Sequence, residues 1–552
     1  MNLTNVPRAL LLAVVLVLTA FHCWLIFASP YLNHDVAQYL SAGQKIAEGG
    51  LPYVDIIDTN PPAILYLSAV PAFVAQILHL PLAKTGLLYW AAIVLGTIGF
   101  ITWLTRRAFP RMGHEEVLFI AGIWITTSIL VYAHRDFAQR DHLIVLFLGT
   151  MFLVRYARYE GTPIPRSASI AGGIAAGFAA AMKPHYLLLM MAIEILLRFR
   201  FRKFSLRLQH AELSSLAVTF VALLVPPVVV PATSGSSLYW IGKIARGYTA
   251  YNTVKVEYIL RMIFSDPWTL FWLIVSLSLS WLALVRGSRD QFTGASLFGI
   301  VALISLLLVI LQHKGWTYHL IPFFVAAAVG LGYLVSDIAR LLRNGYRSMV
   351  IVCGGVLLLP MAFLNPEVRT IAEDTLKQPP WVFPYNNFTE IIKALTRRDE
   401  SVLFISSSVL PAYPAITYSE RNYAGRFLSA FPIAFMYNQS EDYHISPGWQ
   451  DDEPRYLSML IEDVRRDQPK IIAVSLEKNV QALPSYFQIG EYLRMRGFYD
   501  SLGTDYAAVG YFMEFEILIR GDKDHRGKEL DSLASVQLLR KRGLLTPILN
   551  HQ

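Results

Sequence analysis

The chain has 552 residues, of which 54% are hydrophobic and only 16% are charged, and its formal net charge is +8. Soluble domains carry about a quarter charged residues, whereas repeated apolar runs of about 18 residues or more are typical of membrane-spanning helices. The excess of Lys and Arg lies in short segments between these runs, where it sets membrane topology, so it does not indicate a nucleic-acid partner. Cys23 and Cys353 lie inside apolar runs and are poorly placed for a disulfide or a zinc site.

The first apolar run, residues 9–28, is longer than the core of a signal peptide, which has about 7–15 residues. It therefore suits an uncleaved first span; cleavage near Ala28 is the alternative. We expect a polytopic α-helical membrane protein with about 11 transmembrane helices. The expected spans are residues 9–28, 84–105, 117–133, 142–157, 168–182, 186–198, 213–231, 267–285, 294–311, 319–337 and 348–364.

Basic residues cluster in alternate loops between these spans, for example at Arg106, Arg155 and Arg200. The positive-inside rule places such loops in the cytoplasm. The opposite, less basic loops are residues 29–83, 134–141, 183–185, 232–266 and 312–318. An odd number of spans then leaves residues 365–552 outside. We expect a multi-pass protein of the inner (plasma) membrane with an extracytoplasmic C-terminal domain.

The first outer loop, residues 29–83, contains NHDVAQYLSAGQKIAEGGLPYVDIIDTNPPAILYL at residues 33–67. Its apolar residues recur at helical spacing from Val36 onward, which predicts an amphipathic helix on the membrane surface that begins near Asp35. A second apolar helix is expected over residues 63–78, and Pro71 within it favours an interfacial or half-inserted helix over a clean span.

Three carboxylates follow the first span directly. Asp35 has the position of a helix N-cap, where Asp accepts backbone N–H bonds. Asp55 and Asp58 lie beside prolines and are suited to turns. Carboxylates at a bilayer face are nevertheless costly to bury and often mark function, so all three are candidate site residues.

Residues 365–552 differ in composition from the rest of the chain, because charges are frequent and apolar runs shrink to strand length. Buried strands are expected within residues 401–409, 470–476 and 515–520, and helices over residues 386–398 and 454–467. We therefore expect two domains, a transmembrane domain over residues 1–364 and an extracytoplasmic α/β domain over residues 365–552.

Polar clusters occur at the outer ends of several expected spans. They are HRDFAQRD (residues 134–141), Lys183-Pro184-His185, QHKGWTYH (residues 312–319) and the aromatic, basic loop 232–266 with Arg246. Arg and Lys at such a face are suited to a phosphate group. The alternatives are mutually paired charges, such as Arg140 with Asp141, a snorkelling lysine, an interfacial aromatic anchor and a surface helix on anionic headgroups.

The first outer loop resembles that of the GT-C superfamily of membrane glycosyltransferases, which includes the protein O-mannosyltransferases and the lipid A aminoarabinose transferases. The resemblance rests on a helix that begins with Asp after the first span, then G-G-L-P-Y-x-D and N-P-P-A-x-L-Y-L. A-Q-R-D-H-L at residues 138–143 and Q-H-K-G-W-T-Y-H also fit. Many relatives have D-E where this chain has Asp35-Val36, so a second carboxylate comes from elsewhere, with Asp55 and Asp136 as candidates, or is unnecessary.

This resemblance implies an inverting glycosyltransferase that moves a sugar from a polyprenyl-phosphate donor to a glycan, lipid or protein acceptor of the cell envelope. Asp35 would be the general base, and no cofactor is required. Substrate contacts are expected from His34, Tyr53, Asp55, Asp58, Arg135, Asp136, Arg140, Asp141, Lys183, His185, Arg246, His313, Lys314, Tyr318 and His319. A divalent metal on His34, Asp35 and Asp136 is an alternative that no ligand-spacing motif supports.

Two other classes of function fit the membrane character of the chain. One is a flippase or transporter for a lipid or polysaccharide, although transporters usually show internal repeats and polar groups near the midplane. The other is a membrane scaffold whose α/β domain binds a partner.

Overall fold

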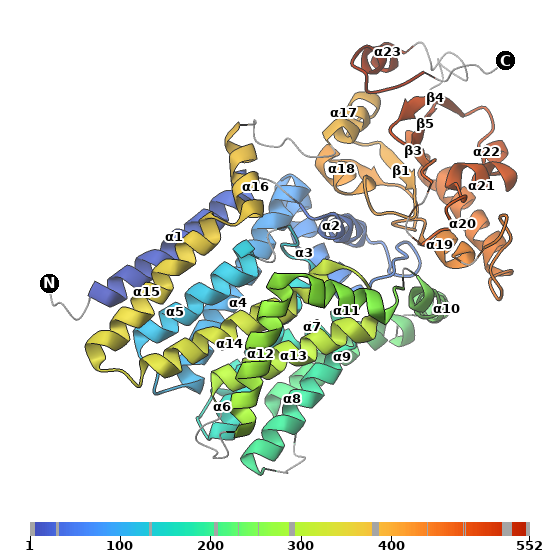
Figure 1. Ribbon diagram of the computed structural model, residues 1–552. Helices are drawn as coiled ribbons and strands as arrows, with labels where there is room; N and C mark the ends of the chain where they lie inside the picture. Colours follow the sequence, from blue (N-terminus) through green and yellow to red (C-terminus); the bar gives the residue numbers. More distant parts are fainter. Residues whose placement is uncertain are drawn as a thin grey trace. The chain divides into compact units, whose positions relative to one another are not determined.

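The computed structural model is mostly helical and describes residues 6–28, 32–131, 135–203, 208–229, 231–251, 253–285, 293–377, 386–438, 440–478, 480, 482–521 and 533–547 (Figure 1). The chain forms two compact units. The helical unit comprises Met1–Asn33, Leu87–Leu224 and Val254–Trp381, and the mixed unit comprises His34–Gly86, Val225–Thr253 and Val382–Gln552.

The helical unit contains long apolar helices joined by short segments. Its helices are α1 (Val6–Ala28), most of α4 (Leu82–Ala108), α5 (His114–Ile125), the π-helix η2 (Thr126–Val131), α6 (Arg140–Glu160), α7 (Arg166–Met182), α8 (Tyr186–Phe201), most of α9 (His210–Val229), α11 (Val256–Ser265), α12 (Pro267–Val285), α13 (Gly294–Gln312), the 3₁₀ turn η4 (Thr317–Leu320), α14 (Ile321–Ala339), α15 (Asn344–Phe363) and α16 (Pro366–Lys377).

Within the described residues, five of these helices are long and apolar enough to cross a membrane: α1, α4, α13, η4 with α14, and α15. The pair α11 and α12 adds a sixth if its 90° bend is a break within one span. All five helices coincide with expected spans. The other expected spans fall on helices that are shorter, broken or more polar, so the count of about 11 stays a prediction.

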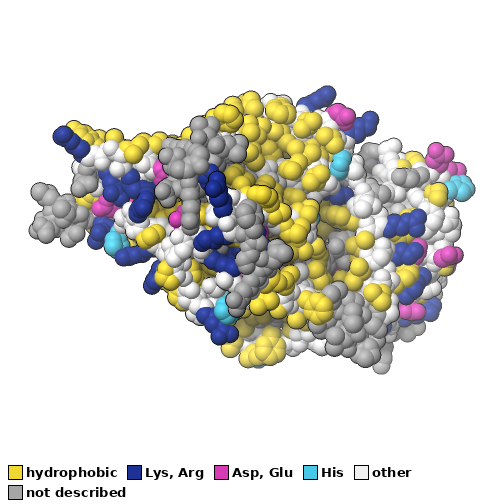
Figure 2. Space-filling view, turned by 90° about the horizontal axis from the view of Figure 1, so that it is seen from below, with side chains coloured by type: hydrophobic (Ala, Val, Ile, Leu, Met, Phe, Trp, Pro, Cys, Tyr) yellow, Lys and Arg dark blue, Asp and Glu magenta, His cyan; other side chains and the backbone are white. Residues whose placement is uncertain are grey.

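Large hydrophobic side chains cover much of the surface. Phe199, Trp281 and Phe220 are each at least 60% exposed, and the face in Figure 2 shows broad hydrophobic areas with Lys and Arg gathered in groups. Soluble monomers rarely expose apolar patches of more than a few hundred Å². This surface is that of a multi-pass membrane protein.

Small residues allow the helices to approach one another closely. A Cβ added to Gly299 on α13 would lie 2.6 Å from the Leu279 Cβ on α12. Close backbone approach at glycine is a common way to pack helices in a membrane, where no hydrophobic effect drives them together.

The mixed unit is built around a five-stranded sheet in the order β2-β1-β3-β5-β4. The strands are β1 (Ser401–Ile405), β2 (Asn422–Tyr423), β3 (Ile471–Ser475), β4 (Tyr506–Phe512) and β5 (Phe515–Arg520). Strand β1 pairs in parallel with β2 and β3, whereas β5 is antiparallel to β3 and β4. Strand β4 has a register shift between Ala508 and Gly510, and its outer edge forms a bridge from Tyr511 to Thr546. The expected C-terminal sheet is confirmed.

The mixed unit also contains helices, and three of them, α2, α3 and α10, come from parts of the sequence distant from the sheet. The helices are α2 (His34–Ala47), α3 (Pro62–Leu78), α10 (Pro231–Ala250), α17 (Asn386–Leu395), α18 (Ala412–Ser419), α19 (Phe431–Tyr437), α20 (Asp452–Asp467), α21 (Ile489–Met495), α22 (Phe498–Ser501) and α23 (Ala534–Lys541). Helix α3 runs through Pro71 and has 17 residues, fewer than the roughly 20 needed to span a bilayer.

The first outer loop packs on the α/β fold within the mixed unit. The Ser41 hydroxyl lies 3.3 Å from the Thr417 hydroxyl, and the Gln44 amide donates a 2.6 Å bond to Asn422 Oδ1. The compact units therefore have different bounds from the two predicted domains, residues 1–364 and 365–552. The predicted domains stay a prediction about membrane placement and function.

Candidate active site

Asp35 is the second residue of α2, in the mixed unit. Its carboxylate lies at the start of the helix, where the N-terminal end of the helix dipole favours a negative charge. The side chain is 16% exposed, and Oδ1 lies 3.6 Å from Nε2 of His34. Every residue from Val36 to Gly43 is buried, so α2 is packed more widely than the predicted surface stripe. Asp35 is thus an accessible acid at the end of a buried helix.

Tyr251 lies near Asp35 and was not recognised from the sequence. Burial, with contributions from Tyr248 and the Asp35 carboxylate, raises the pKa of Tyr251 to about 12. Its ring packs 5.7 Å from the ring of Phe435. Tyr251 follows Asp35 by 216 residues, so the sequence does not indicate that the two are close. The only signal was the aromatic character of loop 232–266, which contains Tyr251.

The other acidic residues of the first loop form turns. Asp55 Oδ2 accepts a 2.9 Å bond from the Leu51 amide, and Asp58 Oδ1 accepts bonds from both the backbone and side chain of Asn60. Tyr53 has a positive φ of 66°, and its carbonyl accepts a bond from the Ser236 hydroxyl. These contacts correspond to the turn-residue alternative.

A buried charge cluster lies in the helical unit at the start of α6. The Asp141 side chain is 0% exposed and accepts a 2.5 Å bond from Lys183 Nζ. The Tyr186 hydroxyl donates to its other oxygen at 3.1 Å. Gln139 caps the helix by accepting from the Asp141 amide at 2.8 Å. The principal cation bonded to Asp141 is therefore Lys183.

Three of the predicted motifs meet at this cluster, those that contain Asp141, Lys183 and Tyr318. Lys183 Nζ lies 5.5 Å from the ring centre of Tyr318, and Tyr318 contacts His319 ring to ring at 4.5 Å. His185 stacks near Tyr186, and burial above all lowers the pKa of His185 to about 4. Within the described residues, neither buried ring nitrogen of His319 has a hydrogen-bond partner. The cluster thus holds neutral polar groups able to receive a ligand.

Lys314 lies on the turn between α13 and η4. Only 3% of the residue is exposed, and burial lowers its pKa to about 8. The preceding residue, His313, has a left-handed conformation with φ of 53°, and its carbonyl accepts a 3.0 Å bond from the Val254 amide. The turn therefore holds a cation away from water.

A cavity of about 790 Å³ opens beside Tyr318 in the helical unit. Arg135, Asp136 and Tyr318 supply polar groups, whereas the rest of the wall is mainly apolar. Its residues are Met262, Asp266, Trp268, Thr269, Thr317, Leu320, Ile321, Phe324, Pro360, Met361, Leu364, Asn365 and Pro366. At the polar end of the cavity, the Asn33 side-chain amide donates to the Arg135 carbonyl at 3.1 Å and to Asp136 Oδ1 at 3.0 Å. These bonds fix the positions of Arg135 and Asp136.

Helix α10 carries Arg246 within the mixed unit. The guanidinium donates to the carbonyls of Gly448 and Pro447 at 3.0 and 3.1 Å and lies 5.2 Å from the ring centre of Trp449. These contacts tie α10 to the α/β fold. Arg246 was predicted to bind a phosphate, but two of its N–H groups already donate to these carbonyls.

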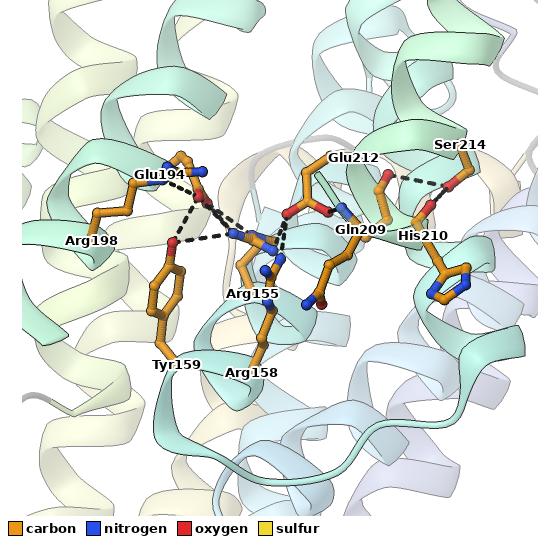
Figure 3. Close-up of polar contacts among 10 residues, drawn as sticks. Arg155, Arg158, Tyr159, Glu194, Arg198, Gln209, His210, Glu212 and Ser214 are labelled. Carbon is orange, nitrogen blue, oxygen red and sulfur yellow. Dashed lines mark hydrogen bonds and ion pairs between the residues drawn. The ribbon is translucent and has the colours of Figure 1, made fainter. Parts of the chain in front are cut away.

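A second charge network lies at the other end of α6 (Figure 3). Arg155 is placed between Glu194 on α8 and Glu212 on α9, and forms ion pairs with both. Arg158 also reaches Glu212, at 2.9 Å. Arg155 follows Arg140 by 15 residues, about 22 Å along a helix, so this network is separate from the Asp141 cluster.

The described residues include no group of three or more His, Cys, Asp or Glu side chains placed to hold a metal ion.

No known family model and no curated protein matches the sequence. Solved structures do match. One is the crystal structure of ArnT from Cupriavidus metallidurans bound to undecaprenyl phosphate, at 14% identity and a TM-score of 0.57, covering 94% of this chain and 98% of that one.

This chain has the fold of ArnT. The apo structure of ArnT matches at 12% identity with a TM-score of 0.51, covering 93% of this chain and 97% of that one. ArnT is a lipid A aminoarabinose transferase of the GT-C group. The resemblance predicted from the first outer loop is therefore confirmed for the fold, over almost the full length of both the chain and ArnT.

Proposed function

We propose that this protein is an inverting glycosyltransferase of the inner membrane that uses a polyprenyl-phosphate-linked sugar. The observation that carries the proposal is the ArnT fold, because the matching structure is that of a protein bound to undecaprenyl phosphate. Transfer takes place on the outer face, with about 11 spans and residues 365–552 on that side, as the charge bias of the loops indicates.

Asp35 acts as the general base. It accepts the proton of the acceptor hydroxyl while the hydroxyl oxygen bonds to the anomeric carbon. The bond between that carbon and the phosphate oxygen breaks, and the lipid phosphate leaves with the electron pair. One displacement inverts the anomeric centre. The partly exposed position of Asp35, at the start of a buried helix, supports this role.

Cations of the helical unit stabilise the charge that develops on the phosphate. Arg135 lies at the polar end of the large cavity and is exposed, and Lys314 is held on a buried turn. The apolar wall formed by α12, α14 and α15 suits a prenyl chain. A donor whose phosphate lies near Tyr318 and whose prenyl chain lies along this wall would match both the polar end and the apolar wall of the cavity.

The Asp35→Asn variant tests the general base. The structure places Asp35 inside the first turn of α2, so the predicted N-cap role is wrong. Asn has nearly the same shape as Asp but accepts no proton, so we expect the protein to fold and sugar transfer from a labelled polyprenyl-phosphate donor to fall by at least about 100-fold. Glu48→Gln is the matched control, because it makes the same carboxylate-to-amide change at an exposed position after α2.

Unchanged turnover in Asp35→Asn would remove Asp35 as the base. A flippase or transporter predicts a different result with the wild-type protein. Labelled lipid would then move between leaflets, and no new glycosidic bond would appear in the products.

A further inference from the structure

A groove of about 670 Å³ lies between α1, α4 and α5 in the helical unit, apart from the cavity and clusters described above. Its lining residues are Arg8, Ala9, Leu12, Gly99, Thr102, Trp103, Arg106, His114, Val117 and Leu118. Helix α1 begins at Val6, α4 ends at Ala108 and α5 begins at His114. The basic residues therefore gather at one end of the groove, and the apolar residues continue along the helices.

The carboxylates near this end are already engaged by other groups. Glu116 on α5 pairs with Arg347 at 2.8 Å and with Arg340 at 3.5 Å. Glu115 accepts a 2.9 Å bond from the Ser348 hydroxyl. A third carboxylate, Asp337, pairs with Arg340.

Arg8 and Arg106 form no hydrogen bond or ion pair with any described residue. Their charges reinforce each other at His114, where the Arg106 guanidinium, together with burial and Arg8, lowers the pKa of His114. The Glu115 carboxylate acts on His114 in the opposite direction and offsets part of this charge, so the two arginines leave a net positive charge at the end of the groove.

The rest of the groove is apolar and open. A Cβ added to Gly99 on α4 meets no atom within 4 Å, so this glycine leaves a notch in the helix surface. Leu12 is 46% exposed and Trp103 is 37% exposed beside it. Helices α1 and α4 both qualify as membrane spans, so the notch lies on a surface that hydrocarbon chains reach.

We infer that this groove binds an anionic phospholipid, with its phosphate between Arg8 and Arg106 and an acyl chain along Leu12 and Gly99. Basic pockets at the ends of transmembrane helices bind anionic headgroups. A free phosphate ion would use only the charged end and would leave the apolar notch uncovered. The inference is independent of the proposed transfer reaction, because it uses none of the proposed catalytic or donor-binding residues.

The full-length protein in detergent, stripped of lipid, provides the test. Phosphatidylglycerol and phosphatidylcholine with the same acyl chains are added separately, and native mass spectrometry counts the retained lipids. We expect phosphatidylglycerol to be retained and to raise the thermal unfolding temperature, and phosphatidylcholine to do neither at the same concentration. Equal retention of the two lipids would overturn the inference, and so would equal stabilisation by inorganic phosphate alone.

Two variants remove the two halves of the site separately. Arg8→Gln with Arg106→Gln removes the charge and should weaken phosphatidylglycerol retention by about 10-fold or more. Gly99→Leu adds a side chain at a position where a Cβ meets no atom within 4 Å, and should reduce retention while both arginines remain. Arg107→Gln is the control, because Arg107 stacks over Trp103 at 5.3 Å but does not line the groove. Normal retention in both groove variants, or equal loss in the control, would contradict the proposal.

Discussion

Lys314 is a cation that the fold has largely removed from water, and this gives it an unusual pH response. Burial lowers the pKa of Lys314 from 10.5 to about 8. The amine is therefore mostly charged at pH 7 and mostly neutral at pH 9. If it binds the donor phosphate, the kcat/KM for the donor falls as the pH rises through about 8.

Two substitutions of Lys314 distinguish the effect of its positive charge from the effect of its deprotonation at high pH. Lys314→Ala should lower kcat/KM for the donor by about 10- to 100-fold, the range expected for one hydrogen bond to a charged group, and should leave the KM for the acceptor nearly unchanged. Lys314→Arg should retain activity but lose the decline above pH 8, because arginine stays charged. Initial rates at varied donor concentration between pH 6 and 10 measure both effects.

A decline that persists unchanged in Lys314→Arg would assign the titration to another group. Equal loss of donor and acceptor use in Lys314→Ala would argue against contact with the phosphate.

Residue partners show where sequence patterns stop being informative. The two motifs that carry Lys183 and Asp141 were both recognised from the sequence, but Arg140 was considered as a partner of Asp141 and Lys183 was not. Lys183 lies 42 residues further along the chain, and no periodicity relates it to α6. His319 was recognised for its chemistry, but its burial without a hydrogen-bond partner among the described residues depends on packing that a sequence alone does not reveal.

At the scale of helices, the network around Arg155 fastens α6 to α8 and α9. Its guanidinium contacts Glu194 and Glu212, while Tyr159 and Arg198 also bond to Glu194. A buried ion network adds little over well-packed apolar residues, but removing one member leaves charges without a partner. These basic residues were expected to set topology, and their role in joining helices became visible only in three dimensions.

Arg155→Ala should therefore destabilise the helical unit by about 1.5–3 kcal/mol, the range for losing a hydrogen bond to a charged group, because Glu194 keeps Arg198 and Glu212 keeps Arg158. The midpoint of thermal unfolding in detergent measures the effect. Arg369→Ala serves as the control, since Arg369 forms only an exposed pair with Glu373 and its loss should leave the midpoint unchanged. A similar midpoint in both variants would show that the network contributes no net stability.

At the scale of the whole molecule, the hydropathy pattern located many of the helices and strands but did not show which of them pack together. The expected spans at residues 9–28, 84–105 and 348–364 fall on long apolar helices, and the three expected strands fall on β1, β3 and β5, because the length and pattern of apolar residues indicate such elements. Strands β2 and β4 were not predicted. The packing of α2 on α18 was not expected, since about 380 residues separate the contacts. A short amphipathic helix fits a membrane surface or a protein surface equally well by pattern alone.

A chain that ends at residue 377 should show what this packing contributes. Removal of the sheet and its helices uncovers the side of α2 that packs on them, where Ser41 and Gln44 bond to Thr417 and Asn422. We expect sugar transfer to be lost and residues 34–61 to become sensitive to protease, as read from cleavage fragments by mass spectrometry. Full activity in the shortened chain would show that α2 holds Asp35 without the α/β fold.

The two edge strands of the sheet, β2 and β4, affect the tendency of neighbouring copies to aggregate through their sheets. Strand β2 has only two residues, and β4 is interrupted by its register shift and bonded through Tyr511 to Thr546 in both directions. Within the described residues, the short β2 and the irregular, partly bonded β4 are poor templates for an incoming strand from a neighbouring copy. Proteins concentrated in a membrane can in this way avoid fusing their sheets into larger aggregates, and trimming the chain just before Thr546 would open one such border.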